Sequence, residues 1–159
     1  MNIVFESKNI LFVKVSPSFA EDYLKMVNDK EVTRFFEARP AYTLEQEIKW
    51  ANNKLANDAT CYSMVEKGSL EFIGNIELMD VDEVSKELGI IITLDKENKG
   101  YGTEAILAIL KYAKEVLGLH KVVLRANPLN KRAIHVYEKC GFSYYNKTSD
   151  KVYMQIIFK

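Results

Sequence analysis

The stretch "LDKENKGYGTEAI", residues Leu94 to Ile106, carries the most information about the architecture of this chain. It places a charged turn after the apolar run "GIIITL" and sets Gly100 and Gly102 in front of a helix-forming segment. Glycine lets the backbone adopt positive φ angles and approach a ligand closely. Three interpretations are open: an ordinary strand-to-helix turn, a dinucleotide-binding fingerprint of the form G-x-G-x-x-G/A, or a cradle for a pyrophosphate.

The dinucleotide fingerprint fits by letter but not by context. "DKENK" separates the strand from the first glycine, and position 120, where an acidic residue would hold a ribose, is His120. A pyrophosphate cradle fits better. Backbone N–H groups of residues 98–103 would point into one concavity at the positive end of a helix, which favours anions. Lys99 and Thr103 add a charge and a hydroxyl, so we expect an anion site here.

Composition limits the function classes. The chain has 159 residues, which predicts a single domain spanning 1–159. Lys plus Arg equals Asp plus Glu at 22 each, so no overall basic field recruits nucleic acid or a membrane surface. No run approaches the roughly 18 apolar residues that cross a bilayer, and we expect no signal peptide. With two cysteines and two histidines we expect no metal site and a cytoplasmic setting.

Hydrophobic periodicity and turn residues predict an α/β protein with a mixed sheet. The strand signals cover 9–15, two strands within 60–80 joined by a hairpin at Gly68, then 86–94, 121–126 and a closing hairpin over 142–158. The helix signals cover 16–29, 43–57, 101–118 and 130–141, and 33–43 is predicted to be irregular. Ser16 and Pro17 are typical of a helix start. The strand–helix–strand stretch from 86 to 126 implies one parallel pair with a right-handed crossover.

Two motifs in this order resemble those of the GNAT superfamily of acetyl-CoA-dependent N-acetyltransferases. They are "LDKENKGYGTEAILAILKYA" and "VLRANPLNKRAIHVYEKCGF", and the resemblance covers most of 72–142. The chain most resembles the branch that contains ribosomal-protein N-terminal and spermidine acetyltransferases. The resemblance implies a single-domain GNAT-like fold, in which a mixed central sheet with a splayed parallel pair is flanked by helices. It also implies acetyl-CoA as cosubstrate and an amine acceptor. A homodimer is possible, and closing strands such as "KVYMQIIF" could pair across its interface.

The same resemblance assigns the cofactor site. The backbone of Ile90, Ile92 and Leu94 would bind the pantetheine arm, with the Ile92 N–H as an oxyanion donor. The pyrophosphate would be held by the loop and first helical turn, and Asn130 would cap a helix and touch the cofactor. The loop and turn residues are Asn98, Lys99, Gly100, Tyr101, Gly102 and Thr103.

One position departs from the family pattern, because Glu97 stands where Gln or Arg is usual. A carboxylate beside a phosphate costs of order 1 kcal/mol even when well solvated. Lys96 and Lys99 are the neighbouring cations that could offset this repulsion.

Tyr137 is the expected general acid. It lies seven positions after Asn130 on one predicted helix, so both can face the same groove. The resemblance implies that Tyr137 protonates the departing thiolate, and a phenol of pKa about 10 suits that step. From the residues alone, a core aromatic and an N-cap remain the alternative. Glu77 and Glu87 are candidate bases or ordinary strand glutamates.

The predicted function is direct transfer of an acetyl group from acetyl-CoA to a primary amine, on a small molecule or a protein N-terminus. Phe35, Phe36, Glu37 and Tyr42 are candidates for lining the acceptor groove, or ordinary packing. Two alternatives stay open at this point. One is a non-catalytic acyl-CoA-binding domain of the same fold, and the other is a structural domain that no longer holds the cofactor.

Overall fold

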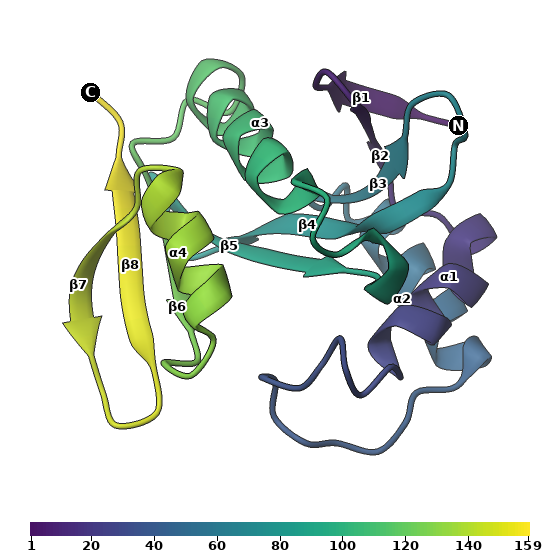
Figure 1. Ribbon diagram of the computed structural model, residues 1–159. Helices are drawn as coiled ribbons and strands as arrows, with labels where there is room; N and C mark the ends of the chain where they lie inside the picture. Colours follow the sequence, from purple (N-terminus) through teal and green to yellow (C-terminus); the bar gives the residue numbers. More distant parts are fainter.

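The computed structural model describes residues 1–159 and forms one eight-stranded sheet with helices on both faces (Figure 1). The strand order is β1-β2-β3-β4-β5-β6-β8-β7. The strands are β1 (Ile3–Glu6), β2 (Ile10–Lys14), β3 (Cys61–Glu66), β4 (Phe72–Asp80), β5 (Ser85–Ile92), β6 (Lys121–Ala126), β7 (Ser143–Lys147) and β8 (Val152–Ile157). The helices are α1 (Ala20–Val27), α2 (Leu44–Ala56), α3 (Tyr101–Glu115) and α4 (Lys131–Lys139), with 3-10 turns η1 (Pro17–Phe19) and η2 (Leu94–Lys96).

The parallel pair β5–β6 is splayed, as predicted. The two strands pair only from Ser85↔Lys121 to Glu87↔Val123. Beyond that point β5 continues to Ile92 and β6 to Ala126 without pairing to each other, while every other pair in the sheet is antiparallel. The divergence leaves backbone groups of β5 without a neighbouring strand in the middle of the sheet.

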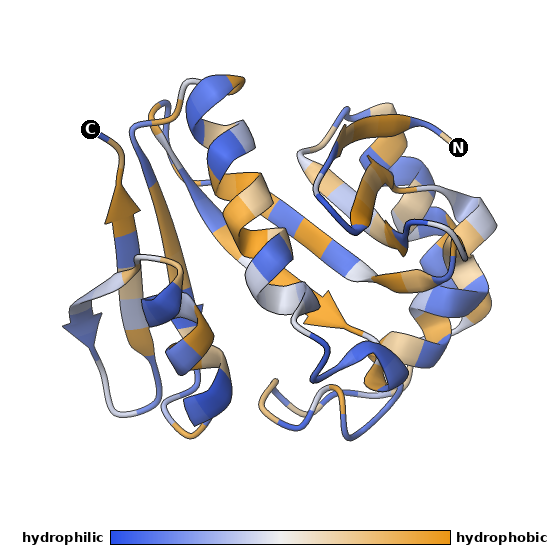
Figure 2. Cartoon of the chain, turned by 45° about the horizontal axis from the view of Figure 1, so that its top comes forward, coloured by the Kyte–Doolittle hydropathy of each residue, from blue (hydrophilic) through white to orange (hydrophobic).

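Alternation along the strands divides the core between two faces. Figure 2 shows apolar residues alternating with polar ones along the central strands, which sends successive side chains to opposite faces. The larger cluster lies under α3 and α4 and includes Phe12, Ile109 and Met154. The smaller cluster lies under α1 and α2 and is centred on Tyr23 and Met26. No helix of the fold is both long enough and apolar enough to span a membrane.

Local capping residues stand at the ends of the helices, although the segment predicted as one helix from Ser16 begins with the 3-10 turn η1 and becomes α1 only at Ala20. The Ser16 hydroxyl accepts the Ser18 N–H, and Pro17 opens the short turn before α1. Thr43 and Gln46 form a capping box at the start of α2. α3 is followed by Gly118 in the left-handed region, at φ 66°.

Three features differ from the sequence-based expectation. β1 was not predicted; it adds to the sheet because Phe5 stacks on Phe12 and Tyr112 at centroid distances of 4.3 and 4.4 Å. β5 ends at Ile92 because η2 begins at Leu94. β8 lies between β6 and β7, so it has no free edge with which to pair to a second copy, and β1 and β7 are the edge strands.

Candidate active site

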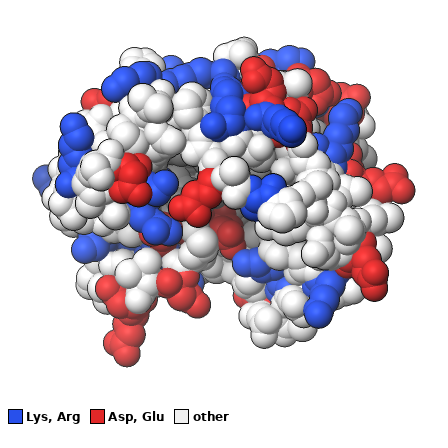
Figure 3. Space-filling view, turned by 90° about the horizontal axis from the view of Figure 1, so that it is seen from below, with Lys and Arg blue, Asp and Glu red and all other residues white.

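Two cavities lie side by side and share part of their walls. The loop cavity, of about 260 Å³, is lined by residues from the loop before α3, from β5, from α4 and from the segment after α1. The α2 cavity, of about 390 Å³, is lined by residues from α2, β4, β5 and the same segment. Four residues line both: Phe36, Ile90, Ile91 and Tyr137. Figure 3 shows the lower face of the molecule, which is hollowed near its middle and carries acidic and basic side chains side by side.

The loop before α3 presents unpaired N–H groups to the loop cavity. Asn98 and Gly100 adopt positive φ angles of 62° and 83°, which turn the chain sharply into the helix. The first backbone bond of α3 runs from the Glu104 N–H to the Gly100 carbonyl at 3.2 Å, and the N–H groups of residues 98–103 donate to no protein acceptor. A row of free donors at the positive end of a 15-residue helix is suited to an anion.

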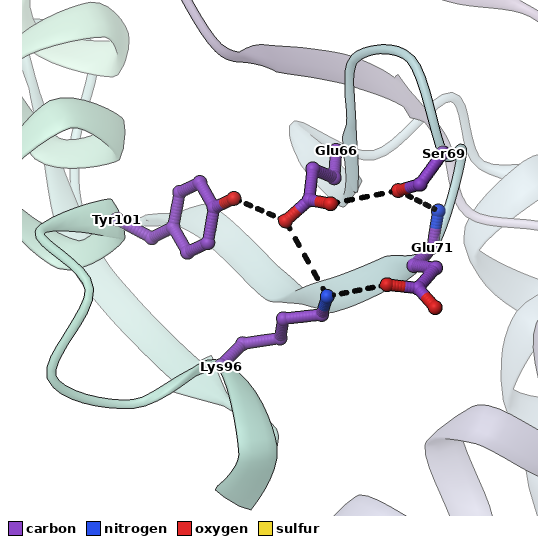
Figure 4. Close-up of polar contacts among 5 residues, drawn as sticks. All are labelled: Glu66, Ser69, Glu71, Lys96 and Tyr101. Atoms are coloured by element: carbon purple, nitrogen blue, oxygen red, sulfur yellow. Dashed lines mark hydrogen bonds and ion pairs between the residues drawn. The ribbon is translucent and has the colours of Figure 1, made fainter.

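A polar cluster around Glu66 fixes both ends of this loop (Figure 4). Lys96, which precedes the loop, is 5% exposed and donates to Glu71 at 2.7 Å and to Glu66 at 3.3 Å. Tyr101, which follows the loop, donates its hydroxyl proton to the same Glu66 carboxylate, and Ser69 donates to it at 2.8 Å. These bonds, that of Tyr101 foremost, lower the pKa of Glu66 to about 2. The last residue of β3 thus holds the loop at two points.

The environment of Glu97 differs from the expected one. Lys96 cannot offset its charge as proposed, because Lys96 is already bound by two other carboxylates. Arg34, in the segment after α1, places Nη1 3.8 Å from Glu97 Oε2 instead. Arg34 and Arg132 both line the loop cavity, whereas Lys99 does not. The cavity therefore contains two guanidinium groups that sequence reasoning did not identify.

The backbone of β5 faces the gap between the splayed strands at alternate residues. The Thr93 N–H donates to the Ile73 carbonyl of β4 at 2.9 Å. Because alternate residues of a strand bond to opposite neighbours, the backbone groups of Ile90 and Ile92 point to the gap, and both residues line the loop cavity. Leu94 lies outside both cavities, and its carbonyl accepts the Glu97 N–H at 3.2 Å within η2.

Tyr137 stands where the two cavities meet. It lies on α4, packs edge-on against Phe142 at 6.1 Å between centroids, and its hydroxyl has no hydrogen-bond partner within the protein. Burial raises the pKa of this phenol, so it stays protonated at neutral pH. Asn130 Oδ1 accepts the Ala133 N–H at 3.2 Å and caps α4, and the residue also lines the loop cavity.

The predicted bases occupy different places. Glu77 lines the α2 cavity and pairs with Lys54 at 2.9 Å. Glu87 lines neither cavity and pairs with Arg125 at 3.1 Å. No group of three or more His, Cys, Asp or Glu side chains is arranged to hold a metal ion.

The loop residues that were candidates for lining the acceptor groove also lie in different places. Phe36 lines both cavities, Phe35 the loop cavity and Tyr42 the α2 cavity, while Glu37 lines neither.

Comparison with known proteins decides the family. Residues 9–143 match the model of the acetyltransferase (GNAT) domain. The chain belongs to the GNAT acetyltransferase family. It is 32% identical over 136 residues to spermidine N(1)-acetyltransferase of Escherichia coli K12, covering 82% of this chain and 73% of the relative. It is 28% identical over 117 residues to the Vibrio cholerae enzyme of the same name, covering 72% and 68%.

Solved structures agree with the GNAT fold. A GNAT-family acetyltransferase from Bacillus anthracis superposes with a TM-score of 0.88 at 23% identity, covering 99% of this chain and 98% of that one. Spermidine N-acetyltransferase from Vibrio cholerae, in complex with CoA and spermine, superposes with a TM-score of 0.80 at 23% identity, covering 93% and 95%. The sheet with its parallel β5–β6 pair and flanking helices is thus the GNAT fold, and the protein is an N-acetyltransferase.

Sequence reasoning also missed one residue that lines the α2 cavity. Glu47, in the first half of α2, is 6% exposed and lines the α2 cavity. The residues that gave α2 its apolar pattern, Leu44, Ile48 and Leu55, are 38 to 41% exposed instead. These apolar residues of α2 are half-exposed and the glutamate is buried, so the hydrophobic pattern could not identify Glu47.

Proposed function

We propose that this protein transfers the acetyl group of acetyl-CoA to a primary amine of a polyamine-type acceptor by direct attack. The observation that carries the proposal is the wall shared by the two cavities, with Tyr137 at their junction. A thioester in one cavity and an amine in the other would meet there. The 32% identity to a spermidine N(1)-acetyltransferase supports this acceptor class, and the fold neighbour in complex with CoA and spermine supports both ligands.

The cofactor fits the loop cavity on chemical grounds. The free N–H groups of residues 98–103 and the guanidinium groups of Arg34 and Arg132 match the negative charge of a pyrophosphate. The gap beside β5 offers the backbone groups of Ile90 and Ile92 to the amide-bearing pantetheine arm, which would extend the sheet at the point where β6 diverges.

The acetyl group then passes directly from the thioester to the amine at the junction, with no intermediate acetylated on the protein. The neutral amine nitrogen attacks the thioester carbonyl, and the Ile92 N–H stabilises the tetrahedral oxyanion. The C–S bond breaks, and the thiolate takes the proton of the Tyr137 hydroxyl. The surplus proton on the new amide nitrogen leaves to solvent or to a carboxylate, and the Tyr137 phenolate regains a proton from solvent before the next turnover. Glu77 is the better placed of the two candidate bases, because it lines the α2 cavity and Glu87 does not.

The experiment that tests this function has two stages. Calorimetric titration with acetyl-CoA measures whether the cofactor binds, and thiol release with spermidine, spermine and an N-terminal peptide then measures turnover. We expect micromolar-range binding and turnover with the polyamines. Binding without turnover for any amine would favour a non-catalytic acyl-CoA-binding domain, and a folded protein that binds no acetyl-CoA would contradict the proposal.

A further inference from the structure

The α2 cavity is lined by one largely buried glutamate, whose carboxylate has no partner in the protein and is open to the cavity. Glu47 is 6% exposed, makes no side-chain hydrogen bond and has no basic nitrogen within 4.0 Å. Burial raises the pKa of its carboxyl group, and Arg39 opposes this only in part. Buried carboxylates are normally paired, because leaving water without a counter-ion is costly. An unpaired one that lines a cavity is a site that a cationic ligand would complete.

The other charged groups of the cavity are already neutralised or solvated. Glu77 is bound to Lys54 and Arg125 is bound to Glu87. Arg39 lies on the exposed segment before α2, where its guanidinium stacks on Tyr42 at 3.7 Å. Glu47 is therefore the acidic group of the cavity left for a ligand.

The position of Glu47 selects which part of the acceptor it contacts. It lines the α2 cavity but not the loop cavity, whereas Tyr137 lines both. The reacting amine must lie at the junction and must be neutral to attack. A group at Glu47 is thus a second, non-reacting group of the same molecule, and it keeps its proton and its positive charge.

Resting on the proposed function, we infer that Glu47 is a specificity-determining residue, which binds the distal ammonium of a linear diamine or polyamine while its other amine reaches Tyr137. A single free carboxylate selects one distal cation. Amines that lack this second charge would occupy the same cavity but leave Glu47 unpaired. The residue then affects how well acceptors are distinguished and leaves the transfer step itself unchanged.

Two acceptors of equal chain length test the inference: 1,5-diaminopentane and pentylamine. We would measure kcat/KM for both in the wild type, in Glu47→Gln and in Glu45→Gln, an exposed glutamate of the same helix. The wild type and Glu45→Gln should prefer the diamine by about tenfold or more, the scale of a charge-assisted contact. Glu47→Gln should reduce the preference to about threefold or less, with pentylamine turnover within about twofold of the wild type.

Several results would overturn it. A wild type without diamine preference, a Glu47→Gln variant that keeps the preference, or an equal loss for both amines would each do so. If the wild type acetylates neither amine, the proposed function fails for these acceptors, and binding of 1,5-diaminopentane measured by calorimetry tests Glu47 instead. Binding that falls tenfold in Glu47→Gln supports the inference; equal binding in both proteins, or none, overturns it.

Discussion

Arg34 forms an ion pair with Glu97 that joins the segment after α1 to the loop before α3, at 3.8 Å between Nη1 and Oε2. Both residues line the loop cavity, so the pair places a compensating cation beside the one carboxylate that a phosphate would meet there. The Arg34 guanidinium attracts the phosphates of the cofactor and the Glu97 carboxylate repels them. Mutation can measure the two effects separately.

A double-mutant cycle on this pair should show coupling. Arg34→Gln should weaken acetyl-CoA binding about tenfold, because it removes a cation and leaves Glu97 uncompensated. Glu97→Gln should strengthen binding a few-fold, and the double variant should lie between the two. We expect a coupling energy of about 1 kcal/mol, the upper range for partly exposed pairs. Calorimetric titration of the four proteins measures it, and strictly additive effects would contradict this view.

Substitutions at Gly102 should change cofactor binding without preventing folding. A Cβ at this position would meet only Ile92 Cδ1, at 3.6 Å, so Gly102→Ala and Gly102→Val should both fold. The branched side chain of valine would project further from the first turn of α3 into the space of the phosphates. We expect Gly102→Val to lose acetyl-CoA binding at least tenfold while Gly102→Ala stays near the wild type, as measured by calorimetry and circular dichroism. Equal binding by both variants would argue against the cradle.

Glu66→Gln should destabilise the protein in a pH-dependent way. The folded pKa of Glu66, about 2, lies below the ordinary value of 4.5. Its contribution is therefore complete above pH 4.5 and is lost as the pH falls toward 2. The Tm difference between wild type and Glu66→Gln should be constant near neutrality and shrink across this window. Glu71→Gln, which changes a more exposed carboxylate on the same lysine, is the control. A Tm difference that does not change with pH would exclude the charge of Glu66 as its cause.

Tyr137→Phe should reduce kcat about a hundredfold or more, while the Kd for acetyl-CoA changes less than twofold, because only proton transfer is lost. Burial disfavours the phenolate and raises the pKa of Tyr137 above its usual 10. The wild-type kcat should therefore show no loss from this group below pH 10. Stopped assays across pH 6 to about 10 measure both effects. A variant with unchanged kcat would remove the phenol from the mechanism.

Gly74→Ala should break the sheet beside the active site. A Cβ there would lie 2.1 Å from the Ile91 carbonyl oxygen, a backbone atom that cannot move alone. We expect a loss of about 3 kcal/mol or more in the free energy of unfolding. Gly68→Ala is the control, because a Cβ at Gly68 has no atom within 4 Å and only its φ of 88° is unfavourable. Thermal unfolding of the two variants should differ clearly, and equal Tm values would contradict the contact.

Features set by neighbouring residues could be predicted from the sequence. The start of η1 at Ser16 and Pro17, the end of α3 near Gly118 and the turn at Gly100 depend on capping and on backbone freedom, which act within a few residues. The splayed pair followed from the family resemblance and from one strand–helix–strand segment.

Features set by contacts between residues far apart in the sequence could not be predicted. β1 is held against the fold by Tyr112 of α3, which stacks on Phe5 and lies far away in the sequence. Glu47 is enclosed in part by residues of the irregular segment 33–43, whose path has no periodic signal. Arg34 belongs to that segment too, so its approach to Glu97 is a product of the folded loop.

The wall shared by the two cavities also has a consequence for inhibition. A single molecule that joins a coenzyme A-like group to an amine chain would extend through the junction at Tyr137 and fill both cavities at once. Once one half is seated, the other is held at millimolar effective concentration beside its own site. Such a conjugate should therefore bind far more tightly than either half alone, without making any contact that the separate substrates lack.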